Sequence, residues 1–308
     1  MDTSIFTITS KADGLPLHSL LVRPDAAPKA IVQFSHGMCE HKERYLPFMQ
    51  YLAGLGYLCI INDHRGHGRS IKSPDDLGYF YAGGAGALVL DLCQIVEWIR
   101  EAYPALPLYL FGHSMGSLAA RCFIKTHDRL IDGLFICGCP SDLALKEAGR
   151  RLVALFCRRR GGHYASKSLN RLFLNALNLR FSAEDSPHAW ICSDPQVVAA
   201  FEADPLCNFA FTMNGYQALL DLMEETYSPD GWQVRKPDLP IWFLSGADDP
   251  CMGSRRALLS AVSLLQKVGY HKVSCRLYDG LRHELLNETA KDEVYADIAG
   301  QLAAWRGL

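Results

Sequence analysis

The sequence lacks any apolar run long enough to cross a membrane. Its longest ones, at 82–90 and 133–139, are far shorter than the roughly 20 residues that a spanning helix needs. The first ten residues, MDTSIFTITS, show no basic stretch followed by an apolar one, so no secretory signal is expected there. Together these absences predict a soluble, cytoplasmic protein.

The chain also lacks a charge bias. Its 31 basic and 33 acidic side chains give a formal net charge of -2, so the overall charge does not favour nucleic acid as a partner. Internal repeats and low-complexity linkers are missing, and apolar residues are spread along the chain, which excludes a disordered protein. With 308 residues, 49% of them hydrophobic, the chain suffices for one large core with an inserted subdomain.

Cysteine is present in an odd number, 11, but without the tight pairs of a zinc site. Cys137 and Cys139 are too close together for an ordinary zinc knuckle, and no second pair accompanies them. Reduced and mostly buried thiols are the simplest account. We therefore expect no zinc site from these cysteines.

Short β-rich runs alternate with amphipathic runs in the first and last parts of the chain. Strand-like runs lie at 5–9, 15–22, 30–34, 57–61, 107–111, 131–137, 240–244 and 272–278. Helical periodicity covers 43–55, 85–102, 115–126, 254–268 and 288–305. This alternation predicts a mostly parallel sheet with helices on both faces.

The alternation stops in the middle of the chain, which is helix-rich and has no obvious buried strand. We interpret 139–236 as a helical cap inserted between two core parts, 1–138 and 237–308. Its 146–180 stretch carries many basic side chains and only one acidic one, Glu147. A solvated basic face explains this pattern, and a surface for anionic lipid headgroups is the alternative. Aromatic residues are not interleaved there as nucleic-acid stacking requires.

The most informative motif is Gly112-His113-Ser114-Met115-Gly116, which joins an apolar strand to a helical run. A serine hydroxyl is a weak nucleophile that needs exposure and a neighbouring base. A tight strand-to-helix turn exposes it, and the flanking glycines leave room for that turn. Ser114 is therefore the candidate nucleophile, and an ordinary glycine-flanked turn is the alternative.

A second motif is the loop 35–41, Ser-His-Gly-Met-Cys-Glu-His, which follows the strand 30–34. Acyl transfer needs N–H donors for the oxyanion of its tetrahedral intermediate. One donor is expected from the residue after the nucleophile, Met115, and the other from this loop, where Met38 is the candidate. A metal site of His36 and His41 is disfavoured because the sequence offers no evident third ligand.

Two later loops supply an acid and a base. In 245–250, Asp249 is preferred over Asp248 because the loop needs a few residues to turn its acid toward a histidine that it then orients. His283 follows the last predicted strand and is the candidate base, with an ordinary surface histidine as the alternative. The acid and the base both follow strands, and the carboxyl ends of parallel strands meet at one sheet edge.

The chain order Ser114, Asp249, His283 is that of α/β-hydrolases. Over nearly its whole length the sequence resembles the monoacylglycerol lipase and lysophospholipase group of that fold, in its bacterial branch. The segments that carry the resemblance are 36–41, 63–70, 112–116, 193–198, 204–207, 245–250 and 278–288.

The resemblance implies a cofactor-free serine hydrolase that cleaves carboxylic esters of single-chain lipids, monoacylglycerol or lysophospholipid, through an acyl-enzyme. It implies a triad of Ser114, Asp249 and His283, with Met38 and Met115 as oxyanion donors. The small lipid ester is the expected partner, and the cap is a candidate for peripheral contact with a membrane surface. The oligomeric state is left open.

Four residues near the motifs are candidates for substrate binding: Gly37, Glu40, Arg44 and His113. The resemblance puts Glu40 and Arg44 near the alcohol-binding end, although a structural ion pair accounts for them equally well. Cys39 departs from the animal members of the group, which usually have glycine at this position. Apolar cap residues are candidates for covering an acyl tunnel, or for plain core packing: Leu152, Leu155, Phe156, Leu172, Phe173 and Leu177.

Other activities remain as alternatives. A short-chain carboxylesterase or a thioesterase needs the same machinery, whereas a serine aminopeptidase also needs acidic groups for the substrate's ammonium. Candidates for that acidic pocket are Glu202, Asp204, Asp221, Glu224 and Glu225. A non-catalytic ligand receptor on the same fold is a remote alternative.

Overall fold

In the computed structural model, which describes residues 1–143 and 146–307, the strands form one eight-stranded sheet. They are β1 (Asp2–Thr9), β2 (Pro16–Arg23), β3 (Ala30–Ser35), β4 (Tyr57–Asn62), β5 (Leu108–His113), β6 (Gly133–Cys137), β7 (Ile241–Gly246) and β8 (Val273–Tyr278). Their order across the sheet is β1-β2-β4-β3-β5-β6-β7-β8. β2 is antiparallel to β1 and β4, and all other neighbours are parallel.

Helices cover both faces of this sheet. The α-helices are α1 (Leu46–Gly54), α2 (Gly84–Ala102), α3 (Met115–His127), α4 (Lys146–Arg160), α5 (Lys167–Asn178), α6 (Pro195–Ala203), α7 (Met213–Tyr227), α8 (Arg255–Lys267) and α9 (Lys291–Arg306). Short 3₁₀ helices are η1 (Lys42–Tyr45), η2 (Pro74–Asp76), η3 (Asp128–Leu130), η4 (Leu179–Phe181), η5 (Ala189–Ile191), η6 (Pro250–Met252) and η7 (Leu285–Asn287).

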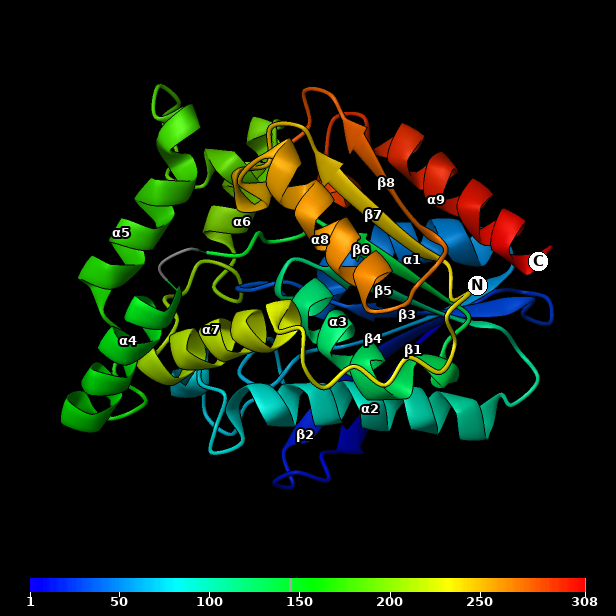
Figure 1. Cartoon of the computed structure of the whole chain (residues 1–308), viewed down its shortest axis with the longest axis horizontal. Helices are drawn as coiled ribbons and strands as arrows, with labels where there is room; N and C mark the ends of the chain where they lie inside the picture. Colours follow the sequence, from blue (N-terminus) through cyan, green and yellow to red (C-terminus); the bar gives the residue numbers. More distant parts are fainter. Residues whose placement is uncertain (144–145, 308) are drawn as a thin grey trace.

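Two apolar layers hold the helices to the sheet. The strands β3 to β7 are buried along their whole length, as strands enclosed on both faces must be. One layer includes Leu92 of α2, Leu118 of α3 and Leu258 of α8, and the other includes Phe48 of α1 and Ile298 of α9. Figure 1 shows these two groups of helices on opposite sides of the sheet. The α/β-hydrolase fold predicted from the sequence is confirmed.

The chain between β6 and β7 is helical, and its described residues contain no strand. Helices α4 and α5 extend away from the sheet (Figure 1), and Val153 and Asn178 are their only buried residues. Helix α7 differs, because it packs against α2 and α3 as well as α4. The division at 139–236 thus stays a prediction, since the last helix of this stretch also belongs to the core.

Several boundaries differ from the sequence-based prediction, and two of the differences have an evident physical reason. The single helix expected at 43–55 is divided into η1 and α1, and Pro47 occupies the first turn of α1, where its missing N–H costs no hydrogen bond. The last helix begins at Lys291 rather than at Glu288, whose carboxylate accepts hydrogen bonds from Ser193 and from the backbone N–H of Arg282. No helix in the described residues is both long and apolar enough to span a bilayer.

Candidate active site

Ser114 occupies the turn between β5 and α3. Its φ of 50° and ψ of -118° place a non-glycine residue in a strained backbone region, as often seen at functional sites. The turn is tight: a Cβ on Gly116 would lie 2.0 Å from the carbonyl oxygen of Ser35, and one on Gly112 would lie 2.7 Å from that of Gly116. The sequence therefore has glycine where no side chain fits.

His283 and Asp249 meet beyond the ends of β8 and β7. Nδ1 of His283 lies 3.0 Å from both carboxylate oxygens of Asp249, which is almost fully buried. The N–H of Cys251 and the hydroxyl of Ser245 also donate to this carboxylate, at 2.8 and 3.3 Å. Asp248 instead accepts a hydrogen bond from Arg180 at 2.9 Å. Of the two aspartates, Asp249 is thus the one in contact with the histidine.

Ser114 and His283 line the same cavity. In the described part of the chain, the hydroxyl of Ser114 and the imidazole of His283 are not hydrogen-bonded to each other. Such contacts are often loose without substrate and tighten in the complex. The indole of Trp190 packs near the imidazole, with its ring centroid 5.1 Å from that of His283. Serine, histidine and aspartate therefore converge at one sheet edge, and only the last two are in hydrogen-bond contact.

The two candidate oxyanion donors lie beside the serine. Met38 and Met115 both line the cavity with Ser114. Met115 is the first residue of α3, where backbone N–H groups have no partner within the helix. The preceding residue in the loop, Gly37, uses its own N–H to bind the carboxylate of Glu40. The N–H of the next residue, Met38, donates to no partner among the described residues and can thus serve an oxyanion.

Glu40 and His113 line the cavity, whereas Gly37 and Arg44 do not. Oε1 of Glu40 lies 3.0 Å from Nδ1 of His113, and Arg44 forms a two-pronged ion pair with Glu284 at 2.6 and 2.7 Å. Sequence reasoning missed Glu284, although it adjoins His283. Four ionic groups therefore form one buried cluster at the cavity wall.

The charges in this cluster stabilise one another. Burial opposes the charge on His113, but the hydrogen bond and the negative charge of Glu40 outweigh it and raise the pKa of the imidazole. Burial likewise opposes ionisation of Glu40, yet His113 and Arg44 hold the pKa of that carboxyl well below its usual range. Each group therefore favours the charged form of the other.

The cavity has a volume of about 370 Å³ and a mostly apolar wall. Among its cap residues are Leu152, Val153, Leu169, Phe173, Leu174 and Leu177. Two residues proposed from the sequence as tunnel cover do not line it: Leu155 and Leu172 are 43% and 67% exposed. Phe156 lies next to Tyr164 rather than on the cavity. Helical periodicity identified the apolar residues but not which of them face the substrate space.

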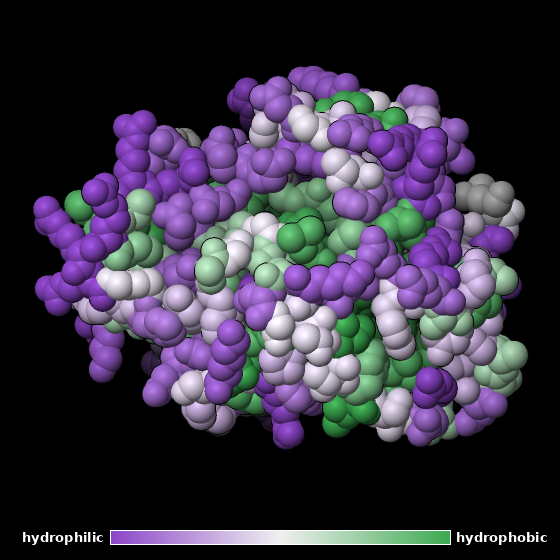
Figure 2. Space-filling model, turned by 90° about the horizontal axis from the view of Figure 1, so that it is seen from below, coloured by the Kyte–Doolittle hydropathy of each residue, from purple (hydrophilic) through white to green (hydrophobic). Residues whose placement is uncertain are grey.

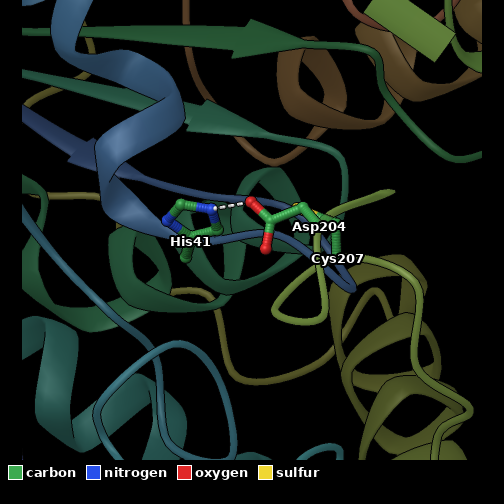
Figure 3. Close-up of side chains that lie close together, drawn as sticks. All are labelled: His41, Asp204 and Cys207. Carbon is green, nitrogen blue, oxygen red and sulfur yellow. Dashed lines mark hydrogen bonds and ion pairs between the residues drawn. The ribbon is translucent and has the colours of Figure 1, made fainter. Parts of the chain in front are cut away.

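One group of side chains outside the triad has metal-ligand chemistry. His41, Asp204 and Cys207 lie together where the 35–41 loop meets the insertion (Figure 3), with candidate ligand atoms within 4.8 Å of one another. The two nitrogens of His41, however, contact Glu43 at 2.7 Å and Asp204 at 2.9 Å. Although burial opposes its charge, these carboxylates raise the pKa of His41. Because both ring nitrogens already contact carboxylate oxygens, neither is left for a metal, and we assign this group to a polar link between loop and cap.

The chain has several relatives of known name. It is 27% identical to a monoacylglycerol lipase of Mycolicibacterium smegmatis over 294 residues, 91% of this chain and 90% of the relative. It is 27% identical to human monoglyceride lipase over 295 residues, 96% and 88% of the two chains. The chain is also similar to the crystal structure of a thermostable carboxyl esterase from Bacillus coagulans. The two are 25% identical and superpose over 99% of each chain with a TM-score of 0.89.

A protein-family profile described as "Serine aminopeptidase, S33" matches residues 26–290. This range contains Ser114, Asp249 and His283, together with the whole helical insertion. The profile therefore spans strands β3 to β8, the insertion and the loops that form the site. The chain belongs to this family of α/β-hydrolases.

Proposed function

We propose that the protein is a serine hydrolase that cleaves carboxylic esters of single-chain lipids, with monoacylglycerol or lysophospholipid as substrate. The observation that carries this proposal is the cavity: a mostly apolar space of about 370 Å³ that reaches Ser114 and His283. A space of this size, apolar except for a few convergent polar groups, is typical of a small-ligand site. The lipase and esterase names of its relatives support the same substrate class.

In the proposed mechanism, His283 takes the proton of Ser114 while the serine oxygen attacks the ester carbonyl. Asp249 holds the imidazole in the tautomer with its free nitrogen toward the serine and stabilises the imidazolium that forms. The N–H groups of Met38 and Met115 receive the oxyanion. The alcohol leaves with the proton from His283, and water then hydrolyses the acyl-enzyme.

The charges around the cavity favour an ester over an N-terminal amine. An aminopeptidase needs an unpaired acid for the substrate's ammonium, yet each of the five acidic residues considered for that role has a basic partner. These partners are His188 for Glu202, His41 for Asp204, Arg150 for Asp221, Lys146 for Glu224 and Lys125 for Glu225. The acids that do line the cavity, Glu40 and Glu284, are paired with Arg44 and His113.

The test is a panel of monoacylglycerols, lysophospholipids, short-chain esters, thioesters and aminoacyl-naphthylamides, with wild-type protein and Ser114→Ala. We expect the single-chain lipid esters to be the best substrates, and turnover of all substrates to vanish in the variant while its unfolding temperature is unchanged. A fluorophosphonate should label Ser114. Preferred cleavage of the naphthylamides, or full esterase activity in Ser114→Ala, would refute the proposal.

The helices α4 and α5 support peripheral contact with an anionic membrane surface as a further part of this proposal. Exposed apolar side chains lie on α4, α5 and the adjoining η4, such as Leu172 at 67% and Leu179 at 74% exposure. Basic residues of the same stretch take part in no ion pair within the described residues: Arg158, Arg159, Arg160, Lys167 and Arg171. Figure 2 shows hydrophilic residues around this end of the molecule with hydrophobic ones between them.

Sedimentation with vesicles tests this contact. We expect binding to vesicles that contain phosphatidylglycerol and much weaker binding to pure phosphatidylcholine, because basic residues near a surface gain about 1 kcal/mol each from anionic lipid. Leu172→Ser with Leu179→Ser should weaken binding. The matched control is Leu90→Ser, since Leu90 is 59% exposed on α2. Equal loss in the control would show that the apolar residues of α5 and η4 have no special role.

A further inference from the structure

We propose that Glu40 and His113 position the catalytic loops and do not bind the alcohol of the substrate. The inference rests on the proposed function, because it concerns how the same site is held together. It reassigns two residues that line the cavity and that sequence comparison puts near the alcohol. Three loops are involved: 35–41 with the oxyanion donor Met38, the turn at Ser114, and the loop that carries His283.

Protein donors already occupy most of the carboxylate of Glu40, and Oε1 in particular. A carboxylate offers about four lone-pair sites. Oε1 accepts hydrogen bonds from the backbone N–H of Gly37, from Tyr45 at 2.9 Å and from His113 at 3.0 Å, and Oε2 accepts one from Arg44 at 3.3 Å. Glu40 itself is only 3% exposed. Binding an alcohol at Oε1 would first require one of these bonds to break, and Oε2 faces the guanidinium of Arg44.

The neighbouring carboxylate is similarly engaged. Oε1 and Oε2 of Glu284 accept from Arg44, and Oε2 also accepts from Asn287 at 3.0 Å. The backbone N–H of Glu284 donates to the carbonyl of Ile191 in the insertion at 2.8 Å. The negative groups beside the catalytic histidine are thus bound by protein donors from several elements.

His113 connects the other two loops. Its Nδ1 donates to Glu40, and its Nε2 donates to the backbone carbonyl of His283 at 3.3 Å. Both nitrogens face oxygen acceptors, which is the arrangement of an imidazolium. The residue directly precedes Ser114, and its ring centroid lies 4.8 Å from that of His283. One side chain therefore links the serine turn to the main chain of the base.

Glycine at position 37 is part of the same arrangement. A Cβ there would lie 2.7 Å from Oε1 of Glu40, 3.0 Å from Nδ1 of His113 and 3.1 Å from the Cβ of Ser114. The carboxylate of Glu40 therefore holds the Gly37 N–H close against the serine turn. This fixes the His36–Gly37 peptide, and the next peptide, which carries the Met38 N–H, is held by a 2.8 Å hydrogen bond from Nδ1 of His36 to the carbonyl of Gly37.

Glu40→Gln tests the inference, with Glu43→Gln as the matched control. Glu43 lies three residues further along the same segment and binds His41 and Lys42 instead. Two esters of one acyl chain serve as substrates, the monoacylglycerol and the methyl ester. The rate at which a fluorophosphonate labels Ser114 gives a third measure that involves no substrate alcohol.

For Glu40→Gln we expect kcat and the labelling rate to fall by about 10- to 100-fold, as misplacement of catalytic groups by a fraction of an ångström does, with KM little changed. The loss in kcat/KM should be the same for both esters, because the alcohol is not contacted. Glu43→Gln should stay within about twofold of wild type on the same scale. His113→Asn should cost a similar factor, and the double variant little more, since residues that act as one unit are not additive.

A loss confined to the monoacylglycerol, with a raised KM and normal labelling, would overturn the inference and make Glu40 an alcohol-binding residue. Wild-type behaviour in Glu40→Gln would overturn it as well. A wild-type protein that is not labelled at Ser114 and hydrolyses no ester would refute the proposed function, and this outcome differs from both of the others.

Discussion

The loops at the carboxyl edge of the sheet and the helices α4 and α5 differ in which side chains they bury and which they expose. The loops bury ionic groups and bind nearly every one of them, as with Asp249, His113 and Glu40. The two helices leave apolar groups exposed and also line an apolar cavity. The loops therefore fix atoms in place, whereas the helices provide a surface and a volume. Substitutions in the two regions should consequently have different kinds of effect.

The largest expected difference lies between two adjacent aspartates of one loop. Asp249→Asn should lower kcat by about 10⁴-fold, because the amide cannot hold the histidine in the required tautomer. Asp248→Asn should have little effect, since Asp248 contacts Arg180 and not His283. Steady-state hydrolysis of one lipid ester by both variants is the measurement. Similar losses in the two variants would contradict the role given to Asp249.

The next contrast is in stability, between a methyl group added in the serine turn and one added in helix α4. Gly116→Ala should lower the free energy of unfolding by about 3 kcal/mol or more, because the new Cβ would lie 2.0 Å from a backbone oxygen that has no room to move. Gly149→Ala in α4 should raise it by about 0.5–1 kcal/mol, since the Cβ meets only Leu220 at 3.6 Å and alanine favours a helix. Urea unfolding measures both. Equal effects would show that the serine turn is less constrained than its geometry indicates.

Acid should weaken the core through its buried neutral histidines. Burial lowers the pKa of His67 to about 4 and that of His64 to about 3. Because an unfolded histidine binds its proton near pH 6.5, the stabilisation is complete above that pH. It is lost as the pH falls toward the folded values, at up to about 1.4 kcal/mol per pH unit for each histidine.

The variant His67→Phe tests the predicted dependence of the unfolding free energy on pH. Its unfolding free energy should fall less steeply between pH 6.5 and 4.5 than that of wild type, by up to about 1.4 kcal/mol per pH unit. Replacing His271, which has an exposed side chain, is the control and should leave the slope unchanged. Urea unfolding at several pH values gives the slopes. An unchanged slope in His67→Phe would mean that this imidazole is already protonated in the folded protein.

The smallest effect is expected from two phenylalanines of the insertion. Phe173 lines the cavity, so Phe173→Ala should reduce kcat/KM for long acyl chains by about fivefold relative to short ones, a difference of about 1 kcal/mol. Phe156 lies beside Tyr164 outside the cavity, so Phe156→Ala should leave this ratio unchanged. A series of monoacylglycerols of increasing chain length is the assay. A changed ratio in Phe156→Ala alone would place the acyl chain elsewhere.

The sequence predicts the sheet and its site better than it predicts the insertion, for a physical reason. Around Ser114 the turn needs glycine at 112 and 116, so the local chemistry leaves a readable motif. The contacts of Glu284 and Tyr45 leave none, because they join segments far apart in the chain. In α5 the periodic leucines are clear, yet Leu172 is exposed and Leu177 faces the cavity. Periodicity marks one apolar face but does not say whether protein, substrate or another surface covers it.

Helix α7 contributes both to the hydrophobic core and to the cavity wall. It returns the chain toward β7 and packs on α2 and α3, while Tyr216, Leu220 and Met223 of the same helix line the cavity. Met223 also belongs to the core cluster. A substitution in α7 that changes the chain-length preference should thus also lower the free energy of unfolding. A substitution in α5 should change the preference without this loss of stability. Directed evolution of specificity should accordingly accumulate first in α5, and reach α7 only after stabilising substitutions elsewhere.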